Sequence, residues 1–160
     1  MKAVAILSVI VLIAALVGVG YLYLTSTVVV EALGVVAVEA TTQEALFNDL
    51  RAQVEERRVL GTAFTTDAPL NAADYQFYTY TVRLRNNCFV TADMVEVQVT
   101  PMAGDVLQLG DTTARALPAQ STGDITATIL TPIGMHSVRE LNVSYYMWGV
   151  PFTIRTTYGY

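Results

Sequence analysis

Residues 75–86 read YQFYTYTVRLRN, and residues 94–101 read MVEVQVTP. In both stretches apolar side chains occupy every second position, and polar or charged side chains lie between them. A side chain that changes face at every residue is the pattern of a β-strand with one buried face. The two stretches therefore predict strands that pack against a common core. The residues expected to face inward are Tyr78, Tyr80, Val82, Leu84, Val95, Val97 and Val99.

Similar patterns, separated by turn residues, predict further strands on both sides. They cover residues 27–38, 105–109, 124–131, 138–147 and 152–158. A total of seven strands with turn signals about 8–12 residues apart is typical of an immunoglobulin-like antiparallel β-sandwich. We therefore expect a mainly β domain over residues 25–160, with Gly34 marking a bulge in its first strand.

One helical pattern interrupts the strands. Thr41 and Glu44 have the spacing of a capping box, and Leu46, Leu50 and Val54 then recur at four-residue intervals. Phe47 widens this apolar stripe, while charged residues occupy the other faces. The pattern predicts an amphipathic helix over about residues 42–58 that lies on the sheet and stops before Gly61.

The N-terminal segment has a different character. Residues 3–24 read AVAILSVIVLIAALVGVGYLYL without a charge, and a helix of this length is about 33 Å long, enough to cross a hydrocarbon core of roughly 30 Å. Lys2 precedes the segment and the first charge after it is Glu31. By the positive-inside rule, residues 1–24 form a cytoplasmic N-terminus and a signal-anchor helix, so residues 25–160 lie outside the cell membrane.

Two other interpretations of this segment exist, and the first of them also exports the domain. A cleaved signal peptide has a shorter apolar region, about 7–15 residues, followed by a small-residue cleavage site; here residues 18–20 fall inside the apolar run and residues 38–40 lie far beyond it. A pilin-like helix would need a short charged leader, a processing site and usually a glutamate near its start, and none of these is visible.

Composition excludes several classes of function. Of the 160 residues, 53% are hydrophobic and only 14% are charged, and the net charge is −5. Scattered basic residues provide no patch for nucleic acid. The single cysteine and single histidine exclude an internal disulfide framework and a Cys/His zinc site. No catalytic motif stands out, so we expect a protein that is not an enzyme and needs no cofactor.

Three runs of sequence suggest a family. They are YTYTVRLRNN at 78–87, MVEVQV at 94–99 and LPAQSTGDITATI at 117–129. Over residues 75–131 the chain resembles membrane-anchored immunoglobulin-like domains of the FxLYD and water-stress (late-embryogenesis) type. That resemblance implies a binding or accessory module without catalytic residues.

Four groups of residues are candidate sites. Asp105, Asp111 and Asp124 are candidate calcium ligands at one end of the sandwich, but no EF-hand spacing is present, and the alternative is solvated aspartates in turns. His136 with Ser137 lacks the motif and the third member of a catalytic triad. Cys88 is either a reactive thiol or a buried cysteine, and no cation beyond Arg85 is near it in sequence to lower its pKa. Asn142-Val143-Ser144 is a glycosylation sequon that falls within a strand.

The aromatic residues near the C-terminus are the candidate binding site. Alternation predicts that Tyr145 and Met147 point inward, which leaves Tyr146 outward and Trp148 at a hairpin tip. Exposed Tyr and Trp side chains are frequent at interfaces. The alternative is that these aromatics fold back onto the core.

The expected function is therefore a non-catalytic, single-pass accessory or binding module. Its expected partners are the lipid bilayer, through residues 3–24, and a protein or polymer of the cell envelope. The alternative is a structural subunit, pilus-like or associated with a surface layer, that assembles as a homo-oligomer through its apolar helix. Gly18 and Gly20 would allow close helix contact, although their spacing is not GxxxG.

Overall fold

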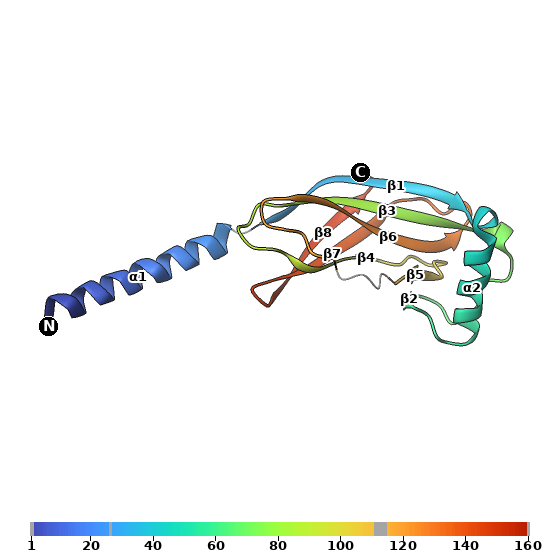
Figure 1. Cartoon of the computed structure of the whole chain (residues 1–160). Helices are drawn as coiled ribbons and strands as arrows, with labels where there is room; N and C mark the ends of the chain where they lie inside the picture. Colours follow the sequence, from blue (N-terminus) through green and yellow to red (C-terminus); the bar gives the residue numbers. More distant parts are fainter. Residues whose placement is uncertain (1, 26, 111–114, 160) are drawn as a thin grey trace.

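An isolated apolar helix leads directly into a two-sheet sandwich (Figure 1). The computed structural model describes residues 2–25, 27–110 and 115–159. Helix α1 spans Lys2–Thr25, and its segment Val4–Leu22 is long and apolar enough to cross a membrane, with none of it buried against the rest of the protein. The expected apolar helix is thus present, and its membrane-length segment does not pack against the protein core.

In the residues that the structure describes, the sandwich contains eight strands and a second helix. The strands are β1 (Val28–Glu39), β2 (Gly61–Ala63), β3 (Tyr75–Asn86), β4 (Asp93–Val99), β5 (Leu107–Leu109), β6 (Thr122–Pro132), β7 (Arg139–Met147) and β8 (Val150–Tyr158). Helix α2 spans Glu44–Glu55, and short 3-10 turns cover Ala40–Gln43 and Ala72–Asp74. The predicted strands are all present, and β2 is an additional one.

The strand order is that of an immunoglobulin-like fold. One sheet has the order β1-β3-β6-β5-β2, the other has the order β4-β7-β8, and all pairings are antiparallel. Without β2, these correspond to the ABED and CFG sheets of constant-type immunoglobulin domains. The predicted mainly β sandwich is therefore confirmed, with β2 added at one edge.

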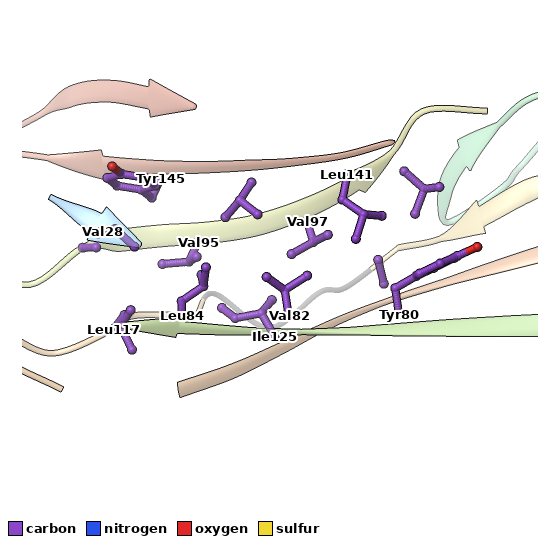
Figure 2. Close-up of a cluster of buried hydrophobic side chains, with 14 of the residues drawn as sticks. Val28, Tyr80, Val82, Leu84, Val95, Val97, Leu117, Ile125, Leu141 and Tyr145 are labelled. Atoms are coloured by element: carbon purple, nitrogen blue, oxygen red, sulfur yellow. The ribbon is translucent and has the colours of Figure 1, made fainter. Parts of the chain in front are cut away.

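The main core lies between the two sheets. Tyr80, Val82 and Leu84 on β3 face Val97 on β4 and Leu141 on β7, as Figure 2 shows. Each of the five is at least 98% buried. The inward side chains predicted for 75–86 and 94–99 are those that form this core, because one face of each strand is covered by the opposite sheet.

A second core lies on the outer face of the large sheet. Phe47, Leu50 and Val54 of α2 pack against Phe77 of β3 and Leu130 of β6, which are direct partners in the β3–β6 ladder. The predicted amphipathic helix on a sheet is confirmed. It covers the end of the sandwich opposite to α1 (Figure 1).

The ends of α2 differ from the prediction. No capping box forms at Thr41 and Glu44, because the chain enters α2 through a 3-10 turn in which the Thr42 hydroxyl donates to the Glu39 carbonyl at 2.7 Å. The helix ends at Glu55 rather than near 58. Arg57 adopts a left-handed φ of 55°.

A Schellman motif closes the helix around Arg57. The N–H groups of Arg57 and Arg58 donate to the carbonyls of Val54 and Gln53 at 3.1 and 2.8 Å. The prediction that Gly61 terminates the helix was therefore wrong. Gly61 instead lies where β2 meets β5, with φ at 131° and no room for a Cβ against the backbone of Gln108.

The bulge in β1 also lies elsewhere than predicted. The register with β3 shifts between Val30 and Ala32, whereas Gly34 pairs regularly with Thr81. The extra residue changes which positions face the core, because Val30 packs inward before the shift and Leu33 packs inward after it. The bulge thus lets apolar residues of β1 face the core on both sides of the register shift.

Candidate functional site

The β7–β8 hairpin ends in a two-residue turn made by Trp148 and Gly149. Met147 pairs with Val150 across it, and both turn residues have positive φ, 51° and 75°. Turns of this kind match the twist of a hairpin, and they favour Asn or Gly because the left-handed region is unfavourable for other residues. Trp148 therefore adopts a left-handed backbone conformation that tryptophan disfavours.

The hairpin aromatics divide as predicted between core and surface. Tyr145 stacks on Phe152 with ring centroids 5.6 Å apart, and Tyr145 and Met147 are buried. Tyr146 and Trp148 are 41% and 49% exposed. Their side chains are therefore presented on the surface at the tip and along the outer face of the hairpin.

Other loops gather at the same end of the sandwich. The Asn86 side-chain nitrogen lies 2.8 Å from the Val90 carbonyl oxygen and 3.0 Å from that of Leu117. The Asn86 side-chain oxygen accepts from the Cys88 N–H at 2.9 Å. Asn86 is fully buried, so this amide joins the loop after β3 to the loop before β6.

This end is also the one from which α1 extends (Figure 1). The Asn87 N–H donates to the Thr27 carbonyl at 3.0 Å, just before β1 begins. Asp93, the first residue of β4, pairs with Tyr146 near the end of β7. The start of β1, the two loops and the hairpin tip therefore lie at the end of the sandwich from which α1 extends.

Exposed apolar side chains are concentrated here, and we call them the proximal collar. The collar consists of Phe89 (75% exposed), Met94 (65%), Tyr146, Trp148 and Val150 (40%). Of these five residues, the sequence pattern indicated only Tyr146 and Trp148. The sequence indicated Phe89 and Met94 only weakly, because each is an apolar residue that does not follow the alternation by which neighbouring apolar residues face the core.

Four of the five collar residues lie in segments without charges, whereas Met94 lies between Asp93 and Glu96. Residues 25–30, 86–92, 116–123 and 143–154 contain no Asp, Glu, Lys, Arg or His. The exposed Asp93 borders them. Beneath the collar, burial raises the pKa of the Tyr145 hydroxyl above its ordinary value, and the nearby Cys88 adds to this effect.

The three candidate calcium ligands do not form a described cluster. Asp124 makes a two-pronged pair with Arg83, with Oδ1–Nε and Oδ2–Nη2 both 2.8 Å, and this guanidinium holds the pKa of Asp124 below its usual value. Asp111 lies outside the described residues. Within the described ranges, no three His, Cys, Asp or Glu side chains come together as a metal-binding group.

Asp105 corrects the expectation of a solvated turn aspartate. Its side chain has no exposed area and forms an ion pair with the equally buried Arg139 at 2.9 Å. The Thr131 hydroxyl and the Met102 N–H both donate to its carboxylate at 2.7 Å. Burial of the carboxylate is possible because these groups satisfy both of its oxygens.

The strands place Arg139 at the start of β7 with its guanidinium inside the protein. Besides Asp105, it donates to the carbonyls of His136 and Val138 at 2.7 and 2.9 Å. The hydroxyl of Tyr80 donates to the Ser137 carbonyl at 2.9 Å. His136 and Ser137 thus contribute backbone oxygens here, and the described contacts do not assemble a triad from their side chains.

Cys88 is 1% exposed. This burial agrees with the interpretation of a structural cysteine packed against the main core. A reactive thiol needs to be accessible, so the alternative of a surface-reactive Cys88 is not favoured.

The end carrying α2 has a separate apolar surface. Leu60 and Leu70 are 66% and 80% exposed, and Met102 and Ile133 are partly exposed nearby. A shallow hollow of about 450 Å³ lies there, lined in part by Tyr75 and Met102. We call this region the distal surface.

Comparisons with known proteins add no assignment. No protein-family model matches the chain, and no curated protein matches it either. The resemblance of residues 75–131 to FxLYD and water-stress domains therefore remains an expectation. What the fold defines is a class, an immunoglobulin-like β-sandwich that follows an apolar helix long enough to span a membrane.

Proposed function

We propose that the chain is a non-catalytic, single-pass membrane protein that holds a binding module on the outer side of the cell membrane. The module would contact a protein or polymer of the cell envelope. The main support is the connection between α1 and the sandwich. Helix α1 ends at Thr25 and β1 begins at Val28, and β1 then pairs with β3 along almost its whole length.

This connection restricts the position of the sandwich. Thr27 is already hydrogen-bonded to Asn87, so there is no long linker between the helix and the folded domain. A domain attached in this way stays beside the bilayer and points its α2 end away from it. Lys2 before the apolar segment favours a cytoplasmic N-terminus.

The two ends of the sandwich would then have different contacts. The distal surface, with Leu60 and Leu70, is the part of the module that reaches farthest into the envelope. Tyr146 and Trp148 lie at the other end, so any contact they make is at the level of the membrane surface. An envelope partner is therefore expected on the distal surface.

Topology can be tested by labelling with a maleimide that does not cross membranes. In a Cys88→Ala background, a Leu70→Cys variant should be labelled in intact cells, and an Ala3→Cys variant, which keeps Lys2, should be labelled only after the cells are opened. The reverse pattern would refute the proposed orientation. Labelling of both variants in intact cells would refute membrane spanning.

Partner contact can be tested by photo-crosslinking in intact membranes. A photoreactive phenylalanine analogue at Leu70 should give a specific adduct with an envelope component, whereas the same analogue at Gln98, midway along the domain, should give much less. The Leu70 adduct should persist in a Tyr146→Ala/Trp148→Ala variant. Equal adducts at Leu70 and Gln98 would contradict a distal binding surface.

A structural role in an assembly is the second candidate. Its support is that Val4–Leu22 is not buried against any part of the protein, so neighbouring helices are an alternative environment to lipid. Electron microscopy of sheared surface material tests it. Filaments or arrays labelled by an antibody against the sandwich would favour assembly over a monomeric anchor.

A further inference from the structure

We propose that the proximal collar docks on the headgroup layer of the same bilayer that α1 spans, so that Trp148 and Phe89 insert at the boundary between headgroups and acyl chains. The proposal rests on the proposed membrane anchoring and names the contact made by Trp148, which the sequence left open. The occupant of this surface is a phospholipid surface.

The short connection to α1 puts the collar within reach of the lipid. The apolar span ends at Leu22, and Thr27 is already part of the folded end of the sandwich. These five residues extend at most about 17 Å even when fully stretched. The headgroup region of one leaflet is about 5–8 Å thick, so this connection is short enough for the collar to reach the layer.

The chemistry of the collar suits that layer. Trp and Tyr rings are enriched at membrane interfaces because one part of each ring is apolar and another is polar. Phe89 and Met94 add apolar area, and the segments that carry the four collar residues other than Met94 contain no charge that would have to be dehydrated. Asp93, the cross-strand partner of Tyr146 and the chain neighbour of Met94, is an exposed charge beside these side chains, so docking must leave its carboxylate in water.

Docking requires the end of the domain near α1 to carry fewer charged side chains than the rest, and the positions of the ion pairs agree with this. Two ion pairs beyond the uncharged segments, Arg85–Glu31 and Arg83–Asp124, lie within β1, β3 and β6. The whole chain carries a net charge of −5, so attraction to anionic lipid does not drive the contact. Insertion of apolar side chains does, and it should be insensitive to salt.

The strained turn gives an independent reason to consider Trp148. Asn-Gly or Gly-Gly would suit a turn in which both residues have positive φ, whereas Trp148 occupies the first position with φ at 51°. Its side chain remains 49% exposed. Strained backbone conformations of this kind cluster at functional sites.

Trp148 is also the only tryptophan, so its fluorescence reports on this site alone. The experiment uses the full chain in phosphatidylcholine vesicles, prepared with or without bromine atoms on the acyl chains near the headgroup. Bromine quenches tryptophan only when the two are close. We expect severalfold stronger quenching of Trp148 in brominated vesicles, unchanged by added salt.

Two relocated tryptophans serve as matched controls in a Trp148→Phe background. Tyr21→Trp reports whether α1 is in the bilayer, and it should be quenched. Leu70→Trp, on the distal surface, should not be quenched. Quenching of both Trp148 and the Leu70 variant would overturn the proposal, because the contact would then not be specific to the collar.

The remaining outcomes separate the two proposals. Quenching of the Tyr21 variant without quenching of Trp148 would refute collar docking and leave the membrane anchor intact. No quenching of either would refute the anchor itself. If Trp148 escapes the brominated lipid but becomes shielded from an aqueous quencher as the protein density in the vesicles rises, a second copy covers the collar and lipid docking is wrong.

Discussion

Arg139 binds both carboxylate oxygens of Asp105 inside the protein, with Nη2–Oδ1 at 2.9 Å and Nε–Oδ2 at 3.2 Å. The two residues are 34 positions apart in the sequence, and neither side chain has any exposed area. The pair fixes the start of β7 against the turn that precedes β5. It is a structural element of the domain rather than a ligand site.

Removing one member of this pair should be costly. We expect Asp105→Ala to lower the free energy of unfolding by about 3–5 kcal/mol, because the Arg139 charge then remains buried without its counter-ion. Urea unfolding of the full chain in detergent, followed by circular dichroism, measures the loss.

The exposed Arg83–Asp124 pair provides the matched control. Asp124→Ala removes a carboxylate with equally short contacts, but both side chains are about half exposed, so stability should change little. A double variant, Asp105→Leu with Arg139→Met, should recover much of what Asp105→Ala loses. Equal losses in Asp105→Ala and Asp124→Ala would contradict the role of burial.

Stability should fall in strong alkali through Tyr80. Burial raises the pKa of its hydroxyl from 10.0 to about 12, while the nearby Arg139 acts in the opposite direction. Between these values the unfolded chain releases the proton and the folded chain keeps it. Tyr80 thus stabilises the fold fully below pH 10, and this contribution is lost as the pH rises toward 12.

The measurement is the free energy of unfolding as a function of pH. One group with this shift gives a slope of at most about −1.4 kcal/mol per pH unit in the window. Tyr80→Phe should be less stable at neutral pH, because the hydrogen bond to Ser137 is lost, and its stability should depend less on pH above 10. An unchanged slope in Tyr80→Phe would assign the alkaline loss to other groups.

The hairpin turn should tolerate a change that removes its tryptophan. Trp148→Asn creates an Asn-Gly turn, which suits positive φ at both positions, and the relieved strain is on the order of 1 kcal/mol. We expect the thermal midpoint of the full chain to be unchanged or higher. A large fall would show that the indole is part of the core.

The neighbouring glycine should respond in the opposite direction. Gly149 has φ at 75°, and a Cβ there meets nothing within 4 Å. Gly149→Ala should therefore destabilise the hairpin through backbone strain alone. Differential scanning calorimetry of both variants, with Tyr146→Ala as an exposed aromatic for comparison, distinguishes strain from packing.

The second core should depend on Phe47. This side chain is 1% exposed and lies 5.9 Å from the ring of Tyr75, centroid to centroid. Phe47→Ala should lower the free energy of unfolding by about 3–5 kcal/mol. Leu70→Ala, at an 80% exposed position on the same end of the domain, should have little effect; a comparable loss there would mean that the distal surface is packed.

Local patterns account for the parts of the fold that the sequence predicted well. The strand expected at residues 75–86 has those bounds in the structure, because its alternation repeats over a long stretch. The stripe of α2 was also predictable, although its ends were not. Arg57 ends the helix in a left-handed conformation that a sequence pattern assigns more readily to glycine.

The sequence also indicated one half of the candidate surface. Tyr146 was expected to point outward because Tyr145 and Met147 face inward, and period-two alternation requires it. Phe89 and Met94 were missed. Their place beside Trp148 depends on loops joined by the Asn86 amide, whose acceptor Leu117 is 31 residues away.

By itself, then, the sequence determined the apolar helix, the strands and the faces they bury, since these follow from side-chain periodicity within a few neighbouring residues. Only the tertiary structure decided the strand order, the burial of Asp105 and the gathering of the collar at the end from which α1 extends. Each of these depends on contacts between residues far apart in the chain, and a local pattern carries no information about which distant segment will satisfy a buried charge or share a loop.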